Sequence, residues 1–347
     1  MTTFYKQNIF HVNKKINLKT FRMHHFKKSI DQVNDFLQKN NLWNQKYIDY
    51  IDKIEKYQSS YIDARTKIKI KDPFMLYFRF SKINNYNTYN FDIRVEGKSV
   101  GTISFKGDNV KISSKHQKNY DAFKIDTRLK NVSIKSEESK KFLKKFEKKE
   151  ESILHSQEHK IESELLNLFS KNSSKFNDKI INSLNPILLY NCYFQFKTPL
   201  GASKVKTKYA KDGNGGSIDL LCRRTLKDKT QRLCIMELKD ENTTTEPPRK
   251  VMNQAIAYAT FIAKLLRSES GDRWYRFFGL GNKVPKELII DTVIVLKYEE
   301  SRFENFDELI DICENTKLQL SDLYFIRKEN RIGTVGFEYL GNYSRNF

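Results

Sequence analysis

Two acidic side chains and a lysine interrupt apolar stretches in the second half of the chain, at a spacing suited to a metal ion. Asp219 lies within SIDLL, and Glu237 and Lys239 close the run LCIMELK. A buried carboxylate is costly unless it is paired or bound to a cation. Two neighbouring carboxylates offer the oxygen ligands that Mg²⁺ or Mn²⁺ prefers, and an ammonium beside them can orient a water molecule. We therefore expect metal-assisted hydrolysis of a phosphodiester, with Mg²⁺ as cofactor and Mn²⁺ as a substitute.

Two strands must bring these three side chains together. SIDLLCRR and RLCIMEL have strand composition and are separated by the polar turn TLKDKTQ. Glu237 and Lys239 are two residues apart, so on a strand they project from the same face. If SIDLL forms the neighbouring strand, Asp219 reaches the same edge.

Two helices are expected to flank this pair of strands. KVMNQAIAYATFIAKLLRS follows Pro247 and Pro248, and its Gln254 and Tyr258 are four residues apart and share one helix face. Upstream, SQEHKIESELLNLFSKN has one apolar stripe, and its Glu162 could lend a further carboxylate. Glu158 and Glu164 are rival candidates, and a surface role stays open for each of the three.

The order Glu162, Asp219, Glu237-x-Lys239 and Gln254-x-x-x-Tyr258 resembles the PD-(D/E)xK nuclease superfamily. The similarity is greatest to its subgroup with a QxxxY helix, which includes RecB-type nuclease domains and lambda-type exonucleases, and it covers roughly residues 156–298. Ile218 stands where the family motif has proline. The resemblance implies the following roles: metal ligands Asp219 and Glu237, accessory ligand Glu162, water-orienting base or electrostatic stabiliser Lys239, and Gln254 and Tyr258 contacting DNA or steadying the site.

The charge of the chain is unevenly distributed. It holds 63 Lys and Arg against 42 Asp and Glu, a net +21. Residues 1–150 contain 33 of the basic and 16 of the acidic side chains, a net +17, and residues 151–347 contain 30 and 26, a net +4. Because each neutralised phosphate releases condensed counterions, we expect nucleic acid as the partner. The alternative is a compositional bias, since Lys, Asn and Ile are abundant together.

The first half is expected to form a separate α+β domain. Residues 26–58 have the apolar spacing of two helices broken near Asn40 and Asn41. Residues 74–113 consist of short β-rich pieces, which predict an antiparallel meander with VEGKSVG as one hairpin turn. Basic residues between its Tyr and Phe suit a nucleic-acid face, and aromatics packed in a core give the same pattern.

The predicted organisation is a basic domain over 1–136, a charged helical linker over 137–155, and a nuclease-like domain over 156–347. In the last of these, residues 187–196 and 288–298 are expected to be strands, the second buried on both faces. A helix near 306–314 and strands near 323–339 complete it. The fold class is therefore α/β (α+β), with a restriction-endonuclease-like mixed sheet flanked by helices.

Several other function classes lack support. The four cysteines have no metal or disulfide spacing and are expected to be buried reduced thiols. No histidine follows His159, so a histidine-based centre would have to span both halves, and no GxxxxGK[ST] loop is present. No signal peptide and no apolar run of roughly 20 residues is evident, so a cytoplasmic protein without a membrane span is expected.

These inferences converge on a Mg²⁺-dependent DNA endonuclease. Double-stranded DNA is the expected substrate, and a homodimer or larger homo-oligomer is expected because cutting both strands needs two sites. The resemblance implies a role in restriction or anti-phage defence. Two alternatives stay open: a nuclease that acts on RNA, and a non-catalytic scaffold that binds nucleic acid with a nuclease-like fold.

Overall fold

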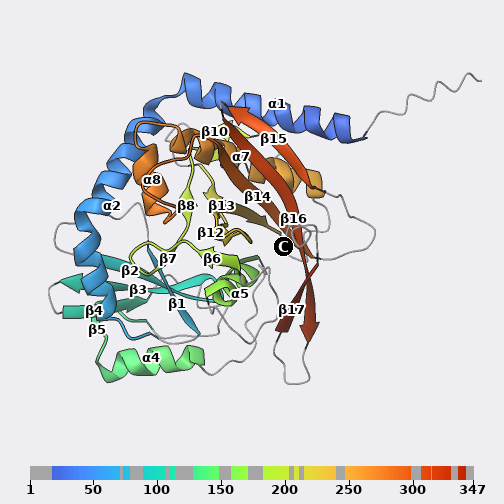
Figure 1. Cartoon of the computed structure of the whole chain (residues 1–347). Coiled ribbons are helices and arrows are strands. Elements are labelled where there is room, and N and C mark those ends of the chain that lie inside the picture. Colours follow the sequence, from blue (N-terminus) through green and yellow to red (C-terminus); the bar gives the residue numbers. More distant parts are fainter. Residues whose placement is uncertain are drawn as a thin grey trace, which may run out of the picture.

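The computed structural model describes residues 18–70, 73–78, 89–106, 109–114, 128–147, 158–170, 183–202, 207–210, 215–239, 247–297, 306–313, 315–329 and 335–340. Within these ranges the chain has a mixed α+β fold with two larger sheets and helices packed against them (Figure 1). The expected mixed α+β class is confirmed. No helix among the described residues is long and apolar enough to cross a membrane.

Helices α1 (Leu18–Lys39) and α2 (Leu42–Thr66) run along the outside of the molecule, in blue in Figure 1. The chain breaks between them at the expected asparagines, where the Asn40 amide donates to the Phe36 carbonyl at 2.8 Å. The Trp43 indole N–H donates to the Leu37 carbonyl at 3.1 Å and ties the two helices across the break. Helix α1 packs on the second half of the chain.

The first sheet contains the predicted antiparallel meander. Its strands pair in the order β5-β4-β3-β2-β1-β7. The hairpin turn is Glu96–Gly97, and both residues have positive φ, as a two-residue turn of the primed type requires. The strands are β1 (Phe74–Phe78), β2 (Tyr89–Val95), β3 (Lys98–Lys106), β4 (Asn109–Ser114), β5 (Val132–Ser133) and β7 (Tyr193–Phe194).

Four aromatic residues on the described strands of the meander belong to the hydrophobic core. Tyr77, Phe78, Phe91 and Phe105 are each at most 3% exposed. Rings at these positions therefore cannot stack on bases, and the core alternative for the Tyr and Phe pattern is confirmed.

The second sheet is mixed and carries the candidate site. Its strands pair in the order β15-β16-β14-β13-β12-β6, and β17 pairs with β16. Strand β14 is parallel to both β13 and β16, and it is buried on both faces, as expected. Its elements are β6 (Leu184–Pro186), β12 (Leu220–Thr225), β13 (Gln231–Leu238), β14 (Leu288–Lys297), β15 (Glu308–Cys313), β16 (Thr316–Glu329) and β17 (Val335–Leu340), flanked by α5 (Glu158–Ser170) and α7 (Pro248–Leu266).

Helices α5 and α7 cover opposite faces of this sheet. Along β13, Cys234 and Met236 pack in one cluster with the apolar side chains of α5, and Leu233 and Ile235 pack in another with α7. Successive residues of a strand point to opposite faces. Glu237 therefore follows Leu233 and Ile235 toward α7.

The strand predicted over residues 187–196 is wrong. The chain reverses at Tyr190 and Asn191, which both have positive φ, and Leu189 forms an isolated antiparallel bridge with Cys192. The Tyr190 hydroxyl donates to the Ile54 carbonyl at 2.7 Å and anchors the turn on α2. A tertiary contact thus divides an apolar run into a turn and two short strands, β7 and β8 (Phe196–Lys197).

The helix predicted near residues 306–314 is also wrong, because this segment is strand β15. Glu308, Ile310 and Ile312 are buried, whereas Leu309 and Asp311 are not, which is the period of a strand. The strands expected near 323–339 are present as β16 and β17, although β16 begins earlier, at Thr316.

The division into domains stays a prediction. Residues 137–147 form the expected charged helix α4 (Glu137–Glu147), and the rest of the linker, 148–155, lies outside the described residues. Two features join the halves: β7 pairs in parallel with β1, and one hydrophobic cluster contains residues of both. Cys192, Cys222 and Cys234 are buried free thiols, as expected, whereas Cys313 is a free thiol that is only partly buried.

Candidate active site

Glu237 lies at the carboxyl end of β13 and is completely buried, at 0% exposure. Its strand is flanked by antiparallel β12 and parallel β14, so both neighbours restrict its backbone. The Gln254 amide of α7 donates to its Oε2 at 2.7 Å, whereas its Oε1 is buried without a hydrogen-bond partner. One oxygen is thus held by a donor, and the other has none, an arrangement that a bound cation would satisfy.

Asp219 lies in a break between two strands rather than inside one. Strand β11 (Ser217–Ile218) pairs with β8, and β12 begins at Leu220, which pairs with Met236 of β13. Because the pairing stops at this point, the Leu238 amide N–H donates to the Asp219 carboxylate, Oδ2, at 3.0 Å. Asp219 and Glu237 are neighbours, as predicted. In addition, a backbone N–H donor fixes the Asp219 side chain.

Burial and nearby acids disfavour the charged forms of both carboxyl groups. Burial, followed by the negative charge of Asp219, raises the pKa of Glu237 well above its usual range. Burial also raises the pKa of Asp219 to about 7, against the lowering effect of the Leu238 N–H. Glu158 and Glu162 raise it further and Lys239 lowers it. The site therefore has more negative charge than its one lysine neutralises, which favours a bound cation.

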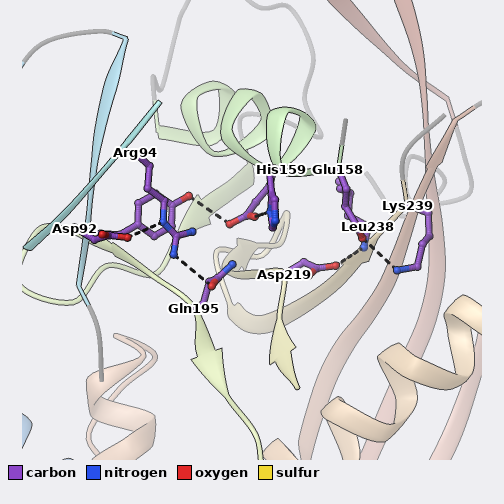
Figure 2. Close-up of polar contacts among 10 residues, drawn as sticks. Asp92, Arg94, Glu158, His159, Gln195, Asp219, Leu238 and Lys239 are labelled. Atoms are coloured by element: carbon purple, nitrogen blue, oxygen red, sulfur yellow. Dashed lines mark hydrogen bonds and ion pairs between the residues drawn. The ribbon is translucent and has the colours of Figure 1, made fainter. Parts of the chain in front are cut away.

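Lys239 directly follows β13 and continues its pairing, since its N–H donates to the Val295 carbonyl at 3.1 Å. Its Nζ contacts Glu158 Oε1 of α5 at 3.2 Å (Figure 2). Burial lowers the pKa of Lys239, but Glu158 and Asp219 outweigh that effect, and the pKa is raised. Lys239 is thus an ammonium, and of its two implied roles the electrostatic stabiliser fits better than the base.

Gln254 and Tyr258 are buried next to the carboxylates and do not lie on the surface. They are 9% and 1% exposed. Burial raises the pKa of Tyr258, and its oxygen accepts hydrogen bonds from the Ala202 N–H and from Gln254. Gln254 therefore links Tyr258 to Glu237. Of the two implied roles, steadying the site fits this burial and DNA contact does not.

The backbone at Gly216 must lie against Tyr258. A Cβ at Gly216 would be 1.9 Å from the Tyr258 hydroxyl oxygen, so a glycine is needed there. This residue was missed from the sequence alone, although the Gly-Gly pair just before SIDLL is a signal for close backbone approach.

The three candidate acids of α5 take different positions. Glu158 contacts Lys239, whereas Glu162 is 3% exposed and accepts a hydrogen bond from the Tyr77 hydroxyl at 3.3 Å. The second oxygen of Glu162 is 3.4 Å from His159 Nδ1. Glu158, a rival candidate in the sequence, is thus the acid paired with the site's lysine, and Tyr77 and His159 are site neighbours that the motif did not indicate.

The donor set fits a divalent cation as a carboxylate pair. Among the described residues, no group of three or more His, Cys, Asp or Glu is arranged to hold a metal ion. Asp219 and Glu237 nevertheless supply adjacent oxygens, and the unpartnered Glu237 Oε1 is buried in a negatively charged site. Mg²⁺ commonly binds through one or two carboxylates and keeps several waters, so this pair meets its needs.

The raised pKa of Asp219 predicts that the metal-free protein is more stable in mild acid. Its pKa is about 7 in the folded protein against an ordinary 3.8, so the folded state keeps a proton that the unfolded chain releases. The free energy of unfolding should fall as the pH rises from about 4 to about 7. We expect a fall of about 2 kcal/mol, which is smaller than the full pKa difference implies, because Asp219 is partly exposed to solvent.

Urea unfolding in EDTA at pH 5 and pH 7.5 measures this effect. Asp219→Asn should reduce the difference without removing it, because the pKa of Glu237 is also raised, and Asp311→Asn, at an exposed position of β15, should leave it unchanged. An Asp219→Asn protein with the wild-type pH dependence would show that Asp219 does not titrate in this window.

Comparison with protein-family models, with curated proteins and with solved structures finds no match to the chain.

Proposed function

We propose that the protein is a Mg²⁺-dependent nuclease that hydrolyses phosphodiester bonds of DNA. One observation carries the proposal: Asp219, Glu237 and Lys239 meet at the end of β13, with a buried Glu237 oxygen that has no hydrogen-bond partner. In a structural ion pair the positive and negative charges would balance. At this site the carboxylates outnumber the single lysine beside them.

Each side chain has a defined task in this proposal. Asp219 and Glu237 would hold Mg²⁺, which supplies Lewis-acid activation of the scissile phosphate and of a water nucleophile. The Lys239 ammonium, held by Glu158, stabilises negative charge that develops on the phosphate oxygens. Gln254 and Tyr258 hold the Glu237 carboxylate at a fixed orientation from α7.

Nucleic acid is the substrate class that the charge favours. The first 150 residues carry a net +17. Where β4, β5 and α4 adjoin, exposed cations outnumber the two exposed acids of α4. These exposed cations are Lys111, Arg128, Lys130, Lys135, Lys140, Lys141, Lys144 and Lys145. Such a surface gives sequence-independent affinity for phosphates.

Endonucleolytic cutting of double-stranded DNA by a homodimer, in restriction or anti-phage defence, is the finer form of this proposal. The DNA substrate and the defence role rest on the motif resemblance. The homodimer or larger homo-oligomer rests on the need for two sites to cut both strands, and light scattering of the purified protein measures it directly.

The proposal predicts Mg²⁺-dependent cleavage of DNA. Supercoiled plasmid, single-stranded DNA and a structured RNA would be incubated with purified protein in Mg²⁺, Mn²⁺ or EDTA. We expect conversion of the plasmid to open-circular or linear forms in Mg²⁺ and in Mn²⁺, and intact plasmid in EDTA. Cleavage of RNA alone would contradict the DNA assignment. Retained DNA binding without cleavage in either metal would contradict the nuclease and favour a scaffold.

A further inference from the structure

We propose that Tyr77 and Arg94, from the first sheet, are positioning residues for the Glu162 carboxylate, so that the basic half of the chain is built into the candidate active site. This inference rests on the proposed function and on the accessory role in binding the metal ion that the motif resemblance implies for Glu162, beside the pair Asp219 and Glu237. It goes beyond that function by giving the N-terminal sheet a role in forming the site as well as in gripping nucleic acid.

Strand β1 contacts helix α5 through Tyr77. Tyr77 is 1% exposed, and its hydroxyl donates to Glu162 Oε1 at 3.3 Å. Burial, followed by the charge of Glu162, raises the pKa of Tyr77 well above its usual range, so the phenol keeps its proton and remains a donor. A buried carboxylate needs such a donor, and this one comes from a strand 85 residues away in sequence.

Tyr77 is itself held in place by neighbouring side chains. The Arg94 guanidinium of β2 lies over the Tyr77 ring, 3.9 Å from its centroid. Arg94 is fixed in turn by Asp92 at 3.2 Å and by the Gln195 side-chain oxygen at 3.5 Å. The Ser99 hydroxyl donates to Asp92 at 2.6 Å. Figure 2 shows this series of contacts extending from Asp92 and Arg94 toward α5 and the site.

A separate contact joins the first sheet to the start of α5. The hairpin tip between β2 and β3 lies against His159, since a Cβ on Gly97 would be 2.3 Å from the His159 carbonyl oxygen. His159 lies between Glu158 and Glu162 on α5, and its Nδ1 is 3.4 Å from Glu162 Oε2. The first sheet therefore restricts both the backbone of this helix turn, at His159, and the Glu162 side chain.

Tyr77→Phe removes the hydroxyl and keeps the ring under Arg94. Isothermal titration of the full-length protein with Mn²⁺, without nucleic acid, should show about a tenfold weaker affinity than wild type, because an outer-shell donor to a ligand is lost. The Mg²⁺ concentration for half-maximal cleavage should rise by a similar factor, and the maximal rate at saturating Mg²⁺ should change less.

Tyr193→Phe is the matched control. Its hydroxyl lies 2.8 Å from Ser170 Oγ at the other end of α5, and its ring is 5.6 Å from that of Tyr77. This variant should bind Mn²⁺ like wild type. An equal loss of affinity in both variants would show that any change near α5 disturbs the site, and would overturn the positioning role.

A double variant separates positioning from general damage. In Glu162→Gln the effect of Tyr77→Phe on Mn²⁺ affinity should nearly vanish, because the two groups act through one contact. Full additivity would overturn the inference, as would a Tyr77→Phe protein with wild-type Mn²⁺ affinity. If the wild type itself neither binds Mn²⁺ nor cleaves nucleic acid, the proposed function fails and takes this inference with it.

Discussion

Replacing Glu237 by glutamine is expected to abolish cleavage while leaving the protein folded and more stable. Gln is nearly isosteric with Glu, and its carbonyl oxygen can still accept the hydrogen bond from Gln254. The negative charge is lost, however, and several kcal/mol of metal-dependent charge stabilisation are lost with it. Since 1.36 kcal/mol corresponds to a tenfold rate, we expect cleavage to fall on the order of 10³-fold.

The gain in stability follows from the same burial. The raised pKa of Glu237 means that its charged form is disfavoured in the folded protein, so a neutral amide removes an unfavourable group. Single-turnover plasmid cleavage and urea unfolding of Glu237→Gln measure both effects. Glu308→Gln is the control, because Glu308 is also buried but lies on β15. A Glu237→Gln protein with wild-type cleavage would exclude Glu237 as a metal ligand.

The second large effect concerns the sheet that carries the site. Arg224 of β12 and Asp291 of β14 form an ion pair at 3.0 Å across β13, and their side chains are 2% and 0% exposed. Burial raises the pKa of Asp291 despite the two arginines beside it, Arg224 and Arg232. Asp291→Ala would leave the Arg224 charge buried without this partner. We expect a loss of about 3 to 5 kcal/mol in the free energy of unfolding, measured by urea titration.

A double replacement distinguishes a structural pair from a functional one. Arg224→Met with Asp291→Val fills a similar volume without charge and should recover most of the lost stability. Its cleavage rate should stay near that of wild type, because this pair lies on the α5 face of the sheet, toward the opposite end of β13 from Glu237. A stable double variant without activity would instead assign the pair to the nuclease chemistry.

Much of the site was predictable because it depends on local periodicity. The apolar run ending in Glu237-x-Lys239 predicts a strand with both side chains on one face, and the spacing of Gln254 and Tyr258 predicts a shared helix face. The structure has these elements, and Gln254 donates to Glu237. Long periodic segments determine their own secondary structure, so short-range sequence patterns suffice for them.

What could not be predicted depends on contacts between distant segments. The turn at Tyr190 is anchored by the Ile54 carbonyl, and Glu162 is held by Tyr77 from the first sheet. Neither contact has a sequence signal. The segment containing Ile310 and Ile312 is ambiguous because its apolar residues fit both a short helix and a strand, and pairing with β16 decides for the strand.

The most direct test of the central claim is plasmid cleavage in Mg²⁺ by wild type, Lys239→Met and Lys227→Met, purified in parallel. Lys239 contacts Glu158 beside the two carboxylates, whereas Lys227 lies in the exposed turn between β12 and β13. Wild type and Lys227→Met should convert supercoiled plasmid at the same rate, and Lys239→Met should leave it intact. Equal cleavage by all three proteins would contradict the proposed active site.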